Sequence, residues 1–161
     1  MNPLPAGTVV LKSKRAQPFY GRHPWVFAGA IDRVEGDPPD GAVVDLRSSA
    51  GNFVSRGLFN GQSKIRVRNY SWDEAAPLDR DFFAARLDRA IALRHDVLHL
   101  NTGPNAAYRV VFSEADGLSG MVADRFGEFA TVQFTSLALA QRKEMLGELL
   151  REKLRVRGVY V

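Results

Sequence analysis

Turn signals recur at short intervals along the first seventy residues and limit the fold more than any other feature of the chain. Gly and Pro cluster most densely at 36–41 (GDPPDG), and Asn60-Gly61 is a hairpin dipeptide. Several short strands at this spacing are typical of a small barrel or sandwich. The runs of β-type residues between the turns lie at 8–14, 30–35, 42–47, 53–58 and 64–70.

The pattern changes after residue 72, and residues 71–77 (SWDEAAP) resemble a linker. Asp79 is a suitable N-cap for a helix that runs to about residue 100. Strand candidates at 108–113, 119–124 and 128–135 predict a meander, and a second helix is expected over 137–154. An apolar stripe with a period of 3.6 marks the first helix: Phe83, Leu87, Ala90, Ile91, Arg94 and Leu98.

Charge is unevenly distributed along the chain. The net charge is +4, but residues 1–72 hold 10 Lys and Arg against 5 Asp and Glu, whereas 73–161 hold 12 against 13. Lys64, Arg66 and Arg68 alternate along one predicted strand, so they share a face at roughly 6–7 Å intervals. That spacing can follow the phosphates of a nucleic acid. The alternative is a solvated strand face with acidic cross-strand partners.

A second basic group stands next to aromatic residues. Lys12 and Lys14 are expected to share a face of the first strand, and Arg15 and Arg22 follow. Aromatic side chains among cations fit single-stranded RNA, because bases stack on rings while phosphates meet charges. Against this, we expect Val26, Phe27 and much of Trp25 to lie in the core, and His23 to make a structural hydrogen bond. The interleaved aromatic residues are Phe19, Tyr20, His23 and Trp25.

Other chemistry has little support in the sequence. The chain contains no cysteine, which excludes disulfides, thiolate metal sites and a cysteine nucleophile within it. Glu114 and Asp116 could serve a small hydrolase or transferase, but Asp116-Gly117 is ordinary turn chemistry. His95 and His99 have metal-binding spacing without a third ligand nearby. We expect no catalytic residue and no metal site, and no signal peptide or membrane span is recognised.

Two stretches carry a family resemblance. Residues 22–27 (RHPWVF) precede Gly29, and Tyr108-Arg109 precedes 114–120 (EADGLSG) and 124–127 (DRFG). Together they resemble the N-terminal region of class I SAM-dependent ribosomal RNA cytosine-5 methyltransferases of the RlmI type. Ser119 departs from this pattern, which usually has proline there. The resemblance implies a PUA-like β-barrel, a small α/β domain and a Rossmann-like catalytic domain that would bind S-adenosyl-L-methionine and supply the catalytic cysteine.

The expected fold is therefore α+β: a PUA-like barrel over 1–72, a linker and helix over 73–105, and a central α/β domain over 106–161. That last domain is expected to be truncated, because the extended segment 159–161 resembles a strand that continues, and the catalytic domain is expected to be absent. We expect a cytoplasmic RNA-docking region of an RNA methyltransferase, acting on 23S ribosomal RNA. The alternative is a protein-interaction module with a merely structural barrel, and a homodimer is a further partner considered. The residues expected to bind RNA are Lys12, Lys14, Arg15, Arg22, His23, Trp25, Lys64, Arg66 and Arg68.

Overall fold

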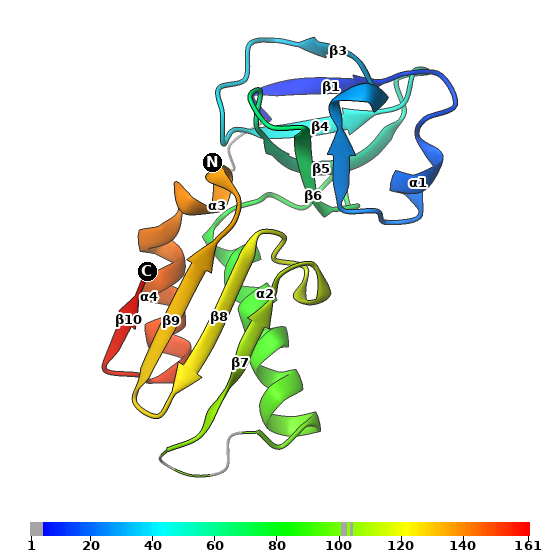
Figure 1. Ribbon diagram of the computed structural model, residues 1–161. Helices are drawn as coiled ribbons and strands as arrows, with labels where there is room; N and C mark the ends of the chain where they lie inside the picture. The colour runs from blue at the N-terminus through cyan, green and yellow to red at the C-terminus, as the bar shows by residue number, and fades with distance from the viewer. Residues whose placement is uncertain (1–4, 101–102, 104) are drawn as a thin grey trace. The chain divides into compact units, whose positions relative to one another are not determined.

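The computed structural model describes residues 5–100, 103 and 105–161. Within it the chain divides into two units, Met1–Asp79 and Arg80–Val161, each with its own core (Figure 1). Together they form a mixed α/β protein in which the first unit is a curled sheet. None of the helices in the described part of the chain has the length and apolar character that crossing a bilayer requires.

The first unit contains a six-stranded sheet in the order β2-β6-β5-β4-β1-β3. Neighbouring strands are antiparallel except for β1 and β4, which are parallel. The two edge strands are consecutive in the chain and are joined by the 3-10 turn η1 (Ala28–Ala30). The strands are β1 (Gly7–Leu11), β2 (Trp25–Phe27), β3 (Ile31–Glu35), β4 (Val43–Arg47), β5 (Phe53–Phe59) and β6 (Ile65–Ser71).

Alternation along the strands builds the core of this unit. Successive side chains of a strand point to opposite faces of the sheet. Val67 therefore enters the core, while Arg66 and Arg68 lie on the other side. Gly57 lies where β5 approaches its neighbour β6 closely. A Cβ at this position would press on the carbonyl oxygen of Arg68, so glycine is needed there. The buried apolar cluster contains Val9, Leu11, Phe19, Val26, Val44, Leu46, Val54 and Val67.

Two expectations for this unit are wrong, and one helix was not expected. The first strand ends at Leu11, so Lys12 and Lys14 lie in the following turn and not on a strand face. A short helix, α1 (Gln17–Tyr20), was not expected; Pro18 suits its first turn and Phe19 anchors it in the core. Phe27 is 47% exposed, because it ends β2 next to η1, and is not a core residue.

The second unit contains the expected meander. Strands β7 (Ala107–Phe112), β8 (Met121–Phe126) and β9 (Phe129–Phe134) are antiparallel neighbours. The chain then passes through α3 (Leu137–Ala140) and α4 (Lys143–Leu154) and returns as β10 (Gly158–Tyr160), parallel to β9. The single helix expected over 137–154 is therefore two helices, interrupted at Gln141 and Arg142. Ser136 caps α3 as expected, accepting a hydrogen bond from the Leu139 backbone.

Both long helices pack on one face of this sheet. Helix α2 (Arg80–Ala92) contacts β7 and α4, and α4 contacts β9 and β10. The apolar stripe expected on the first helix buries Phe83, Leu87 and Ala90. Its last turn is the π-helical segment η2 (Leu93–Val97), after which Leu98 is 52% exposed, contrary to expectation. The opposite face of the sheet carries no helix in the described residues (Figure 1).

Candidate nucleic-acid interface

Trp25 and Arg68 stand opposite each other on the outer side of the β2–β6 pair. Their neighbours Val26 and Val67 are also paired and fully buried, so the alternation turns Trp25 and Arg68 away from the core. The guanidinium carbon of Arg68 lies 5.8 Å from the Trp25 ring centroid. This cation–π contact is worth roughly 0.5–1 kcal/mol at a partly exposed site. It joins a predicted phosphate ligand to a predicted stacking residue.

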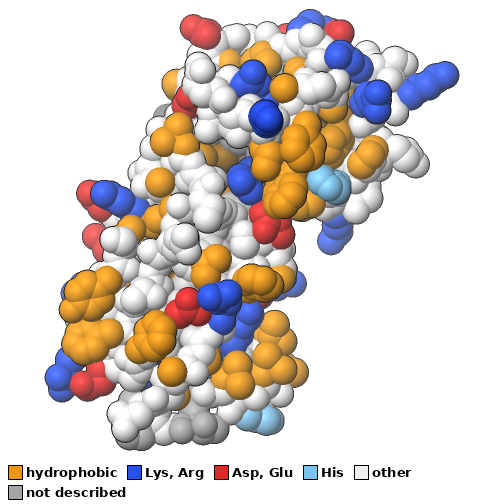
Figure 2. Space-filling model, in the orientation of Figure 1, with side chains coloured by type: hydrophobic (Ala, Val, Ile, Leu, Met, Phe, Trp, Pro, Cys, Tyr) orange, Lys and Arg blue, Asp and Glu red, His pale blue; other side chains and the backbone are white. Residues whose placement is uncertain are grey.

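Aromatic rings continue in both directions from Trp25. The ring centroids of His23 and Trp25 are 6.3 Å apart, and those of Trp25 and Phe27 are 6.5 Å apart, both edge to face. Phe19 extends the row from the core, 6.2 Å from His23. The row therefore runs from a buried ring to an exposed one. In Figure 2 apolar and basic side chains lie side by side on this unit.

The segment before β2 is held in place by Asn69. The Asn69 side chain donates to the His23 carbonyl at 3.1 Å, and its backbone donates to the Pro24 carbonyl at 2.8 Å. Ser55 donates to the Asn69 side-chain oxygen at 2.9 Å, which fixes the orientation of the amide. The backbone N–H of Trp25 donates to Nδ1 of His23 at 3.2 Å. Much of the 22–27 motif thus positions Trp25, and His23 makes the structural hydrogen bond considered for it.

Arg66 and Lys64 extend the basic side of this surface. Arg66 lies on the same side of β6 as Arg68, and its Nη1 is buried without a hydrogen-bond partner in the described residues. Lys64 precedes β6 and is exposed. The register partners of Arg68 are Trp25 on β2 and Leu58 on β5, so no acidic residue stands directly opposite Arg68 in the sheet. We call Arg22, His23, Trp25, Phe27, Lys64, Arg66 and Arg68 the basic aromatic face.

The earlier cations lie in loops. Lys12 donates to the Gly29 carbonyl at 3.1 Å, which ties it to η1 beside Phe27. Lys14 and Arg15 are exposed in the turn after β1. Lys14 and Arg22 have φ angles of 61° and 65°, the left-handed region in which a side chain other than glycine is strained. Such strain is common at functional loops.

Net charge is less asymmetric between the observed units than between the expected ones. Met1–Asp79 holds 10 Lys and Arg against 8 Asp and Glu, and Arg80–Val161 holds 12 against 10. The difference arises because Asp73, Glu74 and Asp79 belong to the first unit. Glu74 pairs with Arg47 at 2.6 Å. The interface therefore rests on the local arrangement of the cations, not on the charge of the unit.

The other candidate sites have structural roles. Glu114 accepts from Ser119 at 2.7 Å, and Asp116 forms an ion pair with Arg94, so both carboxylates hold the turn η3 (Ser113–Asp116). His95 lies 2.6 Å from the Tyr108 hydroxyl. The described residues contain no group of three side chains placed to bind a metal ion.

The chain is similar to a known domain family and to two known enzymes. Residues 9–72 match the model of the PUA-like domain family. The chain is 36% identical over 145 residues to ribosomal RNA large subunit methyltransferase I of Aliivibrio fischeri, which covers 90% of this chain and 36% of the relative. The same enzyme of Photobacterium profundum is 38% identical over 144 residues, with 89% and 36% covered. The chain therefore spans about a third of the length of these relatives.

A solved structure has the same fold. A Streptococcus mutans protein assigned as a SAM-dependent methyltransferase matches with a TM-score of 0.74 at 17% identity, over 92% of this chain and 38% of its own. The cofactor implied by that name is bound by a glycine-rich turn between a strand and a helix in Rossmann-like folds. Here β9 leads into α3 through Thr135 and Ser136. This junction contains no glycine and does not form the turn that would hold S-adenosyl-L-methionine.

Proposed function

We propose that this chain, which is similar over nine-tenths of its length to ribosomal RNA large subunit methyltransferase I and contains a PUA-like domain, docks ribosomal RNA for methylation. The methyl transfer itself would belong to the part of the relatives that this chain does not span. In a longer protein that part would bind S-adenosyl-L-methionine and act on a cytosine of 23S RNA, in the cytoplasm.

The observation that carries the proposal is the stacked pair of Arg68 and Trp25 on the outer side of β2 and β6. A guanidinium held over an indole ring presents both a cation for a phosphate and an aromatic edge for a base. Phe27 adds a half-exposed ring, and Arg66 adds a buried donor that has no partner in the described residues. An unsatisfied buried donor costs free energy that a bound phosphate or base oxygen would recover.

The roles of the residues follow from their positions. Phosphate contacts fix the register of RNA on the protein, and stacking on aromatic rings holds unpaired bases. Arg22 and Lys12 would contact phosphates at the two ends of the aromatic row, and His23 would act by positioning Trp25. The proposed phosphate ligands are Lys12, Lys14, Arg15, Arg22, Lys64, Arg66 and Arg68.

Binding of a structured ribosomal RNA fragment across a salt series tests the proposal. We compare the wild-type chain with the triple variant Lys64→Ala, Arg66→Ala and Arg68→Ala. Each phosphate contact contributes about 0.7–0.9 to the slope of log affinity against log salt, so the triple variant should lower the slope by roughly 2–3. Affinity at low salt should fall with it.

The matched control removes three exposed arginines from the second unit: Arg80→Ala, Arg89→Ala and Arg151→Ala. It changes the net charge equally but leaves the basic aromatic face intact. If both triple variants bind alike, the cations of β6 have no special role and general charge explains the binding. If the wild-type chain binds no RNA at low salt and forms a dimer, the protein-interaction alternative replaces the proposal.

A further inference from the structure

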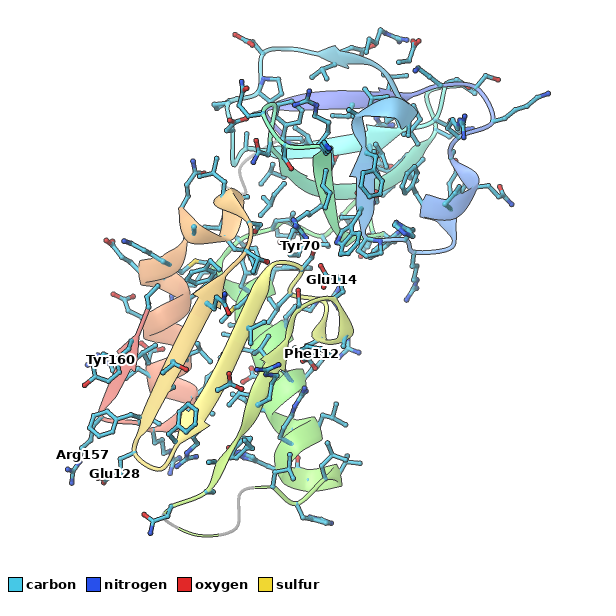
Figure 3. All side chains as sticks on the ribbon, in the orientation of Figure 1. Tyr70, Phe112, Glu114, Glu128, Arg157 and Tyr160 are labelled. Atoms are coloured by element: carbon cyan, nitrogen blue, oxygen red, sulfur yellow. The ribbon has the colours of Figure 1, made fainter. Side chains whose placement is uncertain are left out.

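The second unit's sheet has an unprotected edge at β10. This strand pairs with β9 on one side, and the described residues place no strand on its other side. Edge strands are usually protected by a charge, a proline or a covering segment, because their free N–H and C=O groups can pair with another chain. Residues 158–161 (GVYV) contain neither a charged residue nor a proline. Tyr160, which Figure 3 shows on β10, is 63% exposed, and Val161 is 67% exposed.

A groove of about 500 Å³ runs along this edge. Its two sides are residues 159–161 and the outward row of α4. Gly147 lies in the middle of that row, and a Cβ there would meet no atom within 4 Å. The strand edge and one face of the helix are therefore open to the same occupant. The outward row consists of Lys143, Glu144, Gly147, Glu148 and Arg151.

The charges of the outward row are balanced. It holds two cations and two anions, so it has no net charge that would attract a polyanion such as RNA. Neither Glu144 nor Arg151 takes part in an ion pair within the described part of the chain. By contrast, the neighbouring Glu152 pairs with Arg80 at 3.2 Å. The row therefore has charges available for a partner that carries both signs.

The order of these charges is complementary to its own reverse. Two copies of α4 can lie antiparallel about a twofold axis that passes between Gly147 and Glu148. Glu144 of each copy then faces Arg151 of the other, because the two positions are equally distant from that axis. A twofold contact uses the same surface of both copies, so each such dimer contains this ion pair twice.

The same axis suits the strand. Tyr160 is the middle residue of the β10 segment that lines the groove, as Gly147 is of the outward row. Antiparallel pairing of two β10 strands about Tyr160 brings Val159 of each copy opposite Val161 of the other and joins the two four-stranded sheets. The two Tyr160 rings then extend the contact with Phe129, whose ring centroid is 5.9 Å away. Aromatic cross-strand pairs of this kind stabilise a sheet.

We propose that this edge binds a second copy of the chain, with β10 pairing with β10 and α4 packing against α4. The charge order of the outward row selects this occupant, because it fits its own reverse. The contact uses no residue of the basic aromatic face. The inference is therefore independent of the proposed function, and RNA binding and dimerisation can each fail alone.

Sedimentation of the full chain over a concentration series tests the proposal, and a reversible equilibrium between monomer and dimer is expected. Glu144→Arg places two cations opposite each other at both ion pairs and should weaken dimerisation by roughly tenfold. Arg151→Glu should do the same with two anions. The double variant with both changes restores the pairs with their signs exchanged, so it should dimerise like the wild type. Recovery of this kind requires direct contact between the two positions.

Cross-linking gives a second measurement that does not depend on these charges. The chain contains no cysteine, so a single introduced one reports which residues meet. Gly147→Cys lies next to the axis and should be linked to its own copy by a short bis-maleimide reagent. The control, Arg89→Cys, is exposed on α2 and should stay unlinked. Circular dichroism confirms that each variant is folded.

Three results would overturn the inference. The first is a wild-type chain that stays monomeric over the whole concentration series, because the edge would then serve another occupant. The second is a folded double variant that dimerises no better than Glu144→Arg alone. The third is equal cross-linking of Gly147→Cys and Arg89→Cys, which would place the contact elsewhere.

Discussion

The guanidinium of Arg94 and the carboxylate of Asp116 form a two-pronged ion pair, at 2.5 and 2.9 Å, that is almost withdrawn from solvent. Arg94 also donates to the carbonyls of Arg109 and Ala90. Asp116 in turn accepts from the Phe112 backbone. The pair therefore ties the end of the first helix to β7 and to the turn that follows it.

Breaking this pair should destabilise the second unit. Asp116→Ala leaves a buried guanidinium without its partner, which costs about 3–5 kcal/mol. The matched control, Asp124→Ala, breaks the ion pair with Arg109, which is more exposed than the pair of Arg94 and Asp116. This change should cost at most about 1 kcal/mol. Hydrogen exchange of the β7 amides measures both changes. Equal effects would show that burial does not govern the strength of these pairs.

Glycine at position 22 should weaken RNA binding without loss of stability. Arg22 has a φ of 65°, which glycine adopts without strain. Glycine raises the entropy of the unfolded chain, which destabilises the fold, but Arg22→Gly also removes the backbone strain of the folded state, and the two effects should offset each other. The lost phosphate contact should lower the salt slope by about 0.7–0.9. Lys14→Gly makes the same backbone change at a φ of 61°.

Calorimetry checks stability and a salt titration checks binding for these two variants. A marked drop in melting temperature for Arg22→Gly would contradict the expected relief of strain. An unchanged salt slope would remove Arg22 from the set of phosphate ligands, whatever its effect on stability.

RNA should quench the fluorescence of Trp25. The chain has two tryptophans, and Trp72 donates from its indole to the Phe19 carbonyl at 2.6 Å. The variant Trp72→Phe leaves Trp25 as the only indole, at the cost of that hydrogen bond. A base that stacks on or beside Trp25 should lower its emission in proportion to RNA bound. Emission that stays constant while RNA binding is detected by filter retention would place the RNA elsewhere.

A single methyl group at position 57 should disrupt β6. The Cβ of Gly57→Ala would press on the Arg68 carbonyl oxygen and lie 2.6 Å from a methyl of Val67, both in the paired strand. Overpacking of this kind costs roughly 1–3 kcal/mol or more, and it should displace Arg68 as well. Gly147→Ala in α4 meets nothing within 4 Å and should stabilise the chain by about 0.5–1 kcal/mol. Denaturant melts compare the two; a neutral Gly57→Ala would show that β5 and β6 can separate there.

The sequence predicts regular elements better than contacts between them. Period-2 alternation located most strands of both units, because it depends only on neighbouring residues. It did not locate β2, whose three residues follow Pro24 and suggested a turn or short helix. Helix α1 has four residues, too few for a periodic signal, and it is held by Phe19 in the core and by the distant Trp72. Phe27 resembles a core residue in sequence, but its exposure depends on where β2 ends.

The candidate site was predictable only in part. The alternation of Lys64, Arg66 and Arg68 correctly predicted that Arg66 and Arg68 lie on the opposite face of the strand from Val67. That Arg68 faces Trp25 depends on the register of β2 on β6, which no local pattern specifies. The apolar stripe of the first helix included Arg94, and only the fold reveals why an arginine is buried there.

The short turn η1 joins the two edge strands of the first unit's sheet directly. Because β2 and β3 are consecutive, one segment pairs with β6 at one edge of the curled sheet and with β1 at the other. Proteolytic cleavage of the exposed turn at Gly29 would leave each edge strand held by its own pairing alone, and detachment of either strand would expose an unpaired backbone to other chains. The rate at which a protease cleaves the chain at Gly29 therefore reports how well the first unit protects its edge strands from pairing with other chains.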